Sequence, residues 1–99
     1  MSPAAPNLDR FLHAIADPTR RRILRALQER GGCSLDRETG LCAADIELRV
    51  KLAQPTISHH MRILEKAGLV EAKRVGHWRW YRRNEKLIAE MTRELKGQL

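Results

Sequence analysis

The sequence predicts a mainly α-helical domain with one β-hairpin, in the order α-α-α-α-β-β-α. Apolar residues recur at helical spacing through most of the 99-residue chain. Near its middle, two helical stretches are separated by only three residues, and two extended runs then flank Gly76-His77. This length suits a single domain. We expect a disordered tail over residues 1–7 and the folded domain over residues 8–99.

The first two helices are expected over Leu8–Ala16 and from Pro18 to about Arg30. Asp17 suits the N-cap of the second, and Pro suits a first helical position because its missing N–H would be unpaired there anyway. The inward residues of the second helix are Ile23, Leu24 and Leu27. We interpret Arg20-Arg21-Arg22 as a solvated face, from which one arginine could contact phosphate.

The polar, turn-rich stretch Cys33–Leu41 is predicted to be a loop after Gly31-Gly32. A third helix is expected from about Ala43 to Val50, with Ile46 and Val50 facing inward. Lys51-Leu52-Ala53 then forms a short turn into the next helix. Two helices joined by so short a turn, the second with a polar outer face, form a helix-turn-helix.

That second helix lies in the stretch Gln54–Val70, with a Pro in its first turn and a stop at Ala67-Gly68, where Gly suits a left-handed C-cap. Its inward residues are Ile57, Met61 and Leu64. The next runs, Leu69–Val75 and Trp78–Arg83, predict a β-hairpin, which in this place is called a wing. This hairpin has three aromatic residues, Trp78, Trp80 and Tyr81. Two of them are expected to pack against one another or the helices rather than form a stacking platform.

Asn84 can cap the last helix, predicted over Glu85–Lys96. Apolar residues recur there every four positions, ending at Leu99, which exceeds what a small core needs. Together with the first helix, this stripe predicts a homodimer interface. Its residues are Leu8, Phe11, Leu12, Leu87, Ile88, Met91 and Leu95.

The formal net charge of +7 is concentrated on the second half of the helix-turn-helix and the hairpin. Between Gln54 and Arg83 there are seven Lys or Arg against two Glu, whereas the rest of the chain holds twelve against ten. Such a patch attracts phosphates. We therefore predict that the polar helix enters the major groove of double-stranded DNA. The alternative is a solvated basic face that has no partner.

The predicted DNA-binding residues on the helix have side chains that can meet base edges or phosphates: Gln54, Thr56, Ser58, His59 and Arg62. Those on the hairpin are expected along phosphates or in the minor groove: Lys73, Arg74, His77 and Arg79. For His60, on the apolar side of the helix, a packed and hydrogen-bonded role is favoured over base contact.

The sequence speaks against two other classes of protein. No Ser/His/Asp grouping, phosphate loop or paired carboxylates indicate an enzyme. No run is long enough to span a membrane, and Met1–Pro6 lacks the features of a signal peptide, so we expect a cytoplasmic protein. A protein-interaction module with an incidental basic patch remains a further alternative.

Three segments, in this order, resemble the ArsR family of bacterial winged helix-turn-helix repressors: Ala16–Leu24 (ADPTRRRIL), Gln54–Val70 (QPTISHHMRILEKAGLV) and Gly76–Arg82 (GHWRWYR). The likeness covers roughly Leu8 to Lys96. It implies a dimeric repressor that binds an imperfect inverted repeat and is released by an inducer at a metal or thiol site. The chain departs from the family in the turn, which has Lys51 in place of a usual Gly and Ala53 in place of a usual Ser N-cap.

The sensor sites implied by the resemblance are incomplete. The Cys-x-Cys pattern of the family's arsenic and lead site is matched only by Cys42, and the last helix has no His for the family's zinc site. Cys33 and Cys42, with eight residues between them, leave three readings open. In the first, the two thiols have no sensory role. In the second, they form a redox-switching disulfide. In the third, they bind a metal or metalloid with a third ligand, such as His13 or a partner-chain residue. No other cofactor is predicted.

Overall fold

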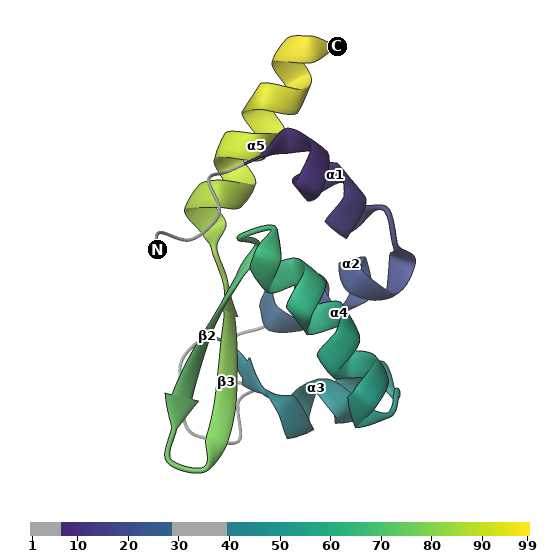
Figure 1. Cartoon of the computed structure of the whole chain (residues 1–99), viewed down its shortest axis with the longest axis vertical. Coiled ribbons are helices and arrows are strands. Elements are labelled where there is room, and N and C mark those ends of the chain that lie inside the picture. The colour runs from purple at the N-terminus through teal and green to yellow at the C-terminus, as the bar shows by residue number, and fades with distance from the viewer. Residues whose placement is uncertain (1–6, 29–39) are drawn as a thin grey trace.

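The computed structural model describes residues 7–28 and 40–99, apart from the side chain of Val75. The elements are α1 (Leu8–Ile15), α2 (Pro18–Gln28), β1 (Leu41–Cys42), α3 (Ala43–Val50), α4 (Gln54–Lys66), β2 (Val70–Val75), β3 (Trp78–Arg83) and α5 (Glu85–Gln98). The fold is the predicted winged helix-turn-helix, mainly α with a hairpin (Figure 1). Cys33, Gly31-Gly32, residues 1–6 of the expected tail and most of the expected loop lie outside the described residues.

Two predicted N-caps are confirmed. The Oδ1 atom of Asp17 accepts hydrogen bonds from the backbone N–H groups of Thr19, at 2.7 Å, and Arg20, at 3.2 Å. The Oδ1 atom of Asn84 accepts from the N–H of Leu87 at 3.2 Å. Both side chains satisfy N–H groups that have no partner within the helix, and so they fix where α2 and α5 begin.

The predicted end of α4 is also confirmed. Gly68 has φ +79°, and its N–H donates to the carbonyl of Glu65 at 2.9 Å while the N–H of Leu69 donates to that of Leu64 at 3.0 Å. This hydrogen-bond pair is the Schellman motif. A Cβ atom at Gly68 would lie 2.7 Å from Cδ1 of Leu87, so glycine also allows α5 to approach closely.

The sheet has three strands rather than the two predicted, in the order β1-β3-β2. Leu41, expected in a loop, pairs with Tyr81, and Cys42 pairs with Trp80, both antiparallel. A strand of two residues has no alternation to detect, and its partner lies about forty residues away. The hairpin itself is as predicted: Val75 faces Trp78 across Gly76-His77, and Gly76 has the positive φ of a type II′ turn.

The core is built from the apolar faces predicted for the helices. The buried residues that were predicted to face inward are Ile23, Leu24, Leu27, Ile46, Val50, Ile57, Met61 and Leu64. In Figure 1, α1 and α5 lie at one end of the molecule, and α3 and the hairpin turn lie at the other. Over the described ranges, 7–28 and 40–99, no helix has the length and apolar character needed to cross a membrane.

The interpretation of Arg20-Arg21-Arg22 as a solvated face is wrong for Arg20, which is 6% exposed. Its Nε and Nη2 atoms donate to the carbonyls of Ala14, at 2.6 Å, and His13, at 3.0 Å. Arg21 donates to the carbonyl of Ile15 at 2.6 Å. These carbonyls belong to the last turn of α1, where the helix leaves carbonyls without N–H partners; among the three, that of His13 also accepts from the N–H of Ala16 at 3.3 Å. Two of the three arginines therefore cap α1.

The predicted dimer residues divide into two groups. Phe11, Leu87 and Met91 are buried within a single chain, in the seam between α1, α5 and the body. The other four remain partly exposed: Leu8, Leu12, Ile88 and Leu95. Only these four residues have surface left to bury against a partner. The interface therefore involves fewer side chains than the seven that the sequence predicted.

Candidate nucleic-acid interface

The outer face of α4 carries the predicted DNA-binding side chains of the helix. Gln54, Thr56, His59 and Arg62 are exposed, and Ser58 is half-buried. They project outward because Ile57, Met61 and Leu64 anchor the opposite face in the core. A helix held by one apolar stripe presents its polar side chains as a rigid set.

The turn that leads into α4 has the two features expected from its unusual residues. Lys51 adopts φ 57° and ψ 47°, the left-handed conformation, and Ala53 occupies the N-cap with no side-chain hydrogen bond. Pro55, in the first turn, has no N–H. The N–H groups of Gln54 and Thr56 are therefore left for water or for a DNA phosphate.

On the hairpin, the predicted residues Lys73, Arg74, His77 and Arg79 are all exposed. Arg74 and Arg79 are direct cross-strand partners. Like charges placed opposite each other on adjacent strands are destabilising, and a bound anion would offset that repulsion. This pairing makes the outer part of the hairpin a suitable place for phosphate.

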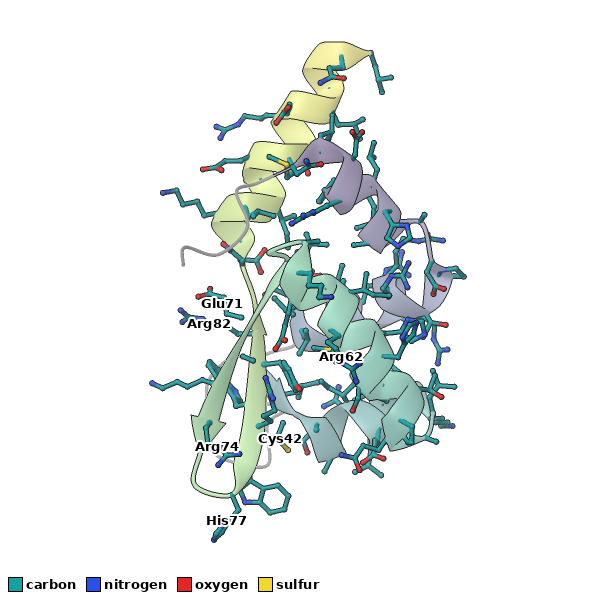
Figure 2. All side chains as sticks on the ribbon, viewed as in Figure 1. Cys42, Arg62, Glu71, Arg74, His77 and Arg82 are labelled. Atoms are coloured by element: carbon teal, nitrogen blue, oxygen red, sulfur yellow. The ribbon has the colours of Figure 1, made fainter. Side chains whose placement is uncertain are left out.

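The recognition concavity is a hollow of about 640 Å³ between α3, α4 and the hairpin. It brings together six of the nine predicted DNA-binding residues: Gln54, Ser58, Arg62, Arg74, His77 and Arg79. Figure 2 shows Arg62 on α4, and Arg74 and His77 near the hairpin turn. Thr56 and His59 lie on α4 outside this lining. Lys73 lines a smaller hollow, of about 230 Å³, with Arg74 and Arg79.

Carboxylates divide the basic surface in a way that sequence reasoning missed. At the base of the hairpin, Arg82 pairs with Glu71 at 3.5 Å, and Arg83 pairs with Glu85 at 3.1 Å. Figure 2 shows Glu71 and Arg82 together, away from the hairpin turn. The cations near α4 and the turn have fewer carboxylate partners than those at the base of the hairpin, and so they are more available to DNA. A charge count along the chain cannot reveal such pairing, although facing positions in the hairpin register indicate the first pair.

Two carboxylates line the recognition concavity, Glu47 and Glu65, and the second forms an ion pair there. Glu65, on α4, is 3.5 Å from Nη2 of Arg79, and both side chains are partly exposed. An exposed ion pair of this kind contributes about 0–1 kcal/mol. It links α4 to β3 weakly enough for a phosphate to compete for Arg79.

His60 has the hydrogen-bonded role predicted for it. Its Nδ1 atom lies 3.2 Å from Nη1 of Arg20. Guanidinium groups only donate, so Nδ1 must accept and the neutral ring carries its proton on Nε2. Burial lowers the pKa of His60 below 6.5; Asp17 opposes this, and Arg20 and His59 add to it. The contact fixes the rear of α4 to the junction of α1 and α2.

Cys42 is 1% exposed, and its thiol donates to Oδ2 of Asp45 at 3.0 Å. Asp45 is itself buried. Ala44 stands where the Cys-x-Cys pattern has its second cysteine, so the described residues do not provide the paired thiolates of the family's arsenic site. In the described parts of the chain, no group of three or more His, Cys, Asp or Glu is placed to hold a metal ion. The predicted pairing of Cys33 with Cys42 involves Cys33, which lies outside the described residues.

A family model, curated relatives and a solved structure all relate this chain to bacterial transcriptional regulators. Residues 17–72 match the model for the arsR family of bacterial regulatory proteins. The chain is 32% identical to a helix-turn-helix transcriptional regulator of Bacillus subtilis, over 87% of this chain and 92% of that protein. It is 31% identical to an arsenical resistance operon repressor of Staphylococcus aureus, over 89% and 76% of the two chains. A solved ArsR-like regulator from a Rhodococcus species matches with a TM-score of 0.75 and 26% identity, over 91% of this chain and 76% of that one.

Proposed function

Since the chain belongs to the ArsR family and is a DNA-binding transcriptional regulator, we propose that it represses transcription as a homodimer on an inverted-repeat operator. Each α4 would enter the major groove of one half-site, and the two half-sites would lie about one helical turn apart. Repression would follow from occupation of the promoter DNA.

The observation that carries this proposal is the recognition concavity. Two consecutive elements, α4 and the β2–β3 hairpin, contribute six predicted DNA-binding residues to one hollow. Hydrogen-bonding side chains come from the helix and cations come mainly from the hairpin, the combination that base reading and phosphate contact require. Within it, Gln54 suits adenine and Arg62 suits guanine, because each can form two hydrogen bonds to that base. Outside it, Thr56, His59 and Lys73 would extend the contact.

The dimer is proposed to form through α1 and α5. Leu8, Leu12, Ile88 and Leu95 leave partly exposed apolar surface on these helices. Both helices lie at the end of the molecule opposite the hairpin turn (Figure 1). A two-fold axis there would keep both α4 helices free to face one side of a duplex, and it would match the symmetry of an inverted repeat.

We propose that Cys42 has a structural role at the start of α3 rather than a sensory one. Its thiol is buried and already donates to Asp45. The alternative, a redox or metalloid switch through Cys33 and Cys42, is tested by measuring DNA affinity in reduced, oxidised and metal-treated protein. Equal affinities support the structural role. DNA release that Cys33→Ser or Cys42→Ser abolishes would establish the switch.

The named relatives are transcriptional regulators, and we propose that this chain likewise performs no catalysis. We place it in the cytoplasm, where a regulator of bacterial type meets its DNA.

The proposal is tested by selecting duplexes of about 30 base pairs from a random pool with the full-length protein, a length that holds two half-sites. We expect an inverted repeat to emerge. It should bind roughly a thousandfold more tightly than a shuffled duplex of equal composition at moderate salt. Equal affinities for the selected and shuffled duplexes would overturn sequence-specific repression, because phosphate contacts alone do not discriminate.

A further inference from the structure

Trp78 is the one aromatic residue of the hairpin that the fold leaves in solvent. Its side chain is 52% exposed, whereas Trp80 is 5% and Tyr81 is 7% exposed. Trp78 follows the two-residue turn directly, so it lies beyond the part of β3 that β1 covers. Tryptophan is enriched at binding interfaces, so an exposed indole on a strongly charged hairpin is a candidate contact for a partner.

The surroundings of Trp78 indicate what it binds. It lines the recognition concavity together with Arg62, Arg74 and Arg79. These three guanidinium groups and the His77 ring outnumber the two carboxylates of that lining, Glu47 and Glu65. An apolar ring framed by cations suits a partner that is polyanionic and also has apolar surface. The sugar–phosphate backbone of DNA has both properties.

We propose that Trp78 contacts the DNA strand that lies between α4 and the hairpin, an inference that rests on the proposed function. The indole face packs against deoxyribose carbons, and its Nε1–H is free to turn toward a phosphate oxygen. The contact is uncharged, so it displaces no counterions. Trp78 therefore adds affinity that persists at high salt, where the contributions of Arg74 and Arg79 decline.

Intrinsic fluorescence tests the contact directly, because the chain has only two tryptophans and Trp80 is buried. In free protein, acrylamide should quench Trp78 and leave Trp80 nearly unaffected. Addition of the selected inverted-repeat duplex should protect the accessible indole. Trp78→Phe is the matched control: it should show only the inaccessible emission of Trp80, with and without duplex.

Affinity measured over a range of salt concentrations separates Trp78 from its charged neighbours. Trp78→Ala should weaken binding by roughly tenfold, the scale of an aromatic contact with nucleic acid, and leave the slope of log affinity against log salt unchanged. Arg74→Ala should reduce that slope by about one. An unaltered circular dichroism spectrum and Trp80 emission show that Trp78→Ala is folded.

The outcomes distinguish this inference from the function on which it rests. Protection of the indole with a salt-independent loss of affinity supports it. If the duplex binds tightly while acrylamide quenches Trp78 as in free protein, the indole contact is wrong and the repressor proposal stands. If the indole becomes protected with increasing protein concentration in the absence of DNA, its partner is a second copy of the chain, and the inference is overturned. If no duplex is bound in a sequence-specific way, the proposed function is wrong, and the inference that rests on it is overturned as well.

Discussion

The Nη1 atom of Arg20 lies 3.2 Å from the Nδ1 atom of His60, forty residues along the chain. The same guanidinium group holds the last carbonyls of α1 through His13 and Ala14, and it lies 4.0 Å from Asp17. One buried side chain thus joins the proposed dimerisation helix, the start of α2 and the back of the DNA-reading helix.

Stability should fall in mildly acidic solution because of His60. Burial lowers its pKa in the folded chain below the ordinary value of 6.5. Above pH 6.5 both the folded and unfolded states are neutral at this ring. As the pH falls from 6.5 toward the lowered pKa, the unfolded state binds a proton that the folded state excludes, so the free energy of unfolding decreases. Urea unfolding at a series of pH values measures this slope.

The control for the pH prediction is His60→Asn, whose side-chain oxygen can replace Nδ1 as the acceptor for Arg20. We expect a shallower slope in this window, and a wild-type slope would assign the effect to another histidine. Asp17 acts in a separate range: burial raises its pKa, but the N–H groups of Arg20 and Thr19 hold it below 3.8. The contribution of Asp17 to the free energy of unfolding is therefore lost only as the pH falls below 3.8.

Arg20→Met should be strongly destabilising. It leaves the buried carbonyl of Ala14 and the partly buried Nδ1 atom of His60 without their donor, and it removes one of two donors to the carbonyl of His13. We expect a loss of about 3 kcal/mol in the free energy of unfolding. Arg21→Met is the matched control, because its hydrogen bond to Ile15 is exposed. It should cost less than about 1 kcal/mol, and similar losses for both variants would contradict the special role of Arg20.

Lys51→Gly should stabilise the protein. Lys51 has φ 57°, a conformation in which its Cβ crowds the backbone and which glycine adopts without that strain. The expected gain is roughly 0.5–1 kcal/mol, measured by thermal unfolding. Lys51→Ala removes the same charge but keeps a Cβ, so it should bring no comparable gain. A gain equal to that of the glycine variant would show that charge rather than backbone strain was relieved.

Arg62→Ala and Arg74→Ala should affect DNA binding in different ways. Arg62 projects from α4, and its loss should cost about 1–3 kcal/mol of discrimination at one base pair. Arg74 faces Arg79 on the hairpin, and its loss should weaken binding to every sequence alike. Affinities for the selected duplex and its single-base variants distinguish these outcomes. A uniform loss for Arg62→Ala would identify Arg62 as a phosphate contact.

Leu95→Glu should dissociate the proposed dimer. Leu95 is only partly buried on α5, so a charged side chain there should disturb the single chain little and oppose burial against a partner. Light scattering coupled to size exclusion measures the mass. Leu48→Glu is the control, since Leu48 is 76% exposed on α3, at the other end of the molecule. A wild-type protein that is monomeric at working concentration would contradict the interface itself.

The sequence by itself determined the features whose causes are local. Asp17 and Asn84 were identifiable as caps because each bonds an N–H two or three residues away. Gly68 could be recognised as the end of α4 because its hydrogen bonds reach back only a few residues. Lys51 and Ala53 were identifiable as weak points of the turn through the resemblance to the family, which usually has Gly and Ser at these positions. Periodicity then gave the inward faces of the helices, since one helix alone sets that spacing.

Tertiary structure decided what depends on distant partners. Three consecutive arginines look alike in sequence, and only the approach of α1 and α4 buries Arg20. Leu41–Cys42 becomes a strand only because β3 offers its edge. Coverage by the rest of the fold likewise separates buried Trp80 from exposed Trp78. Such outcomes arise from contacts that close loops of tens of residues, and local propensity does not encode them.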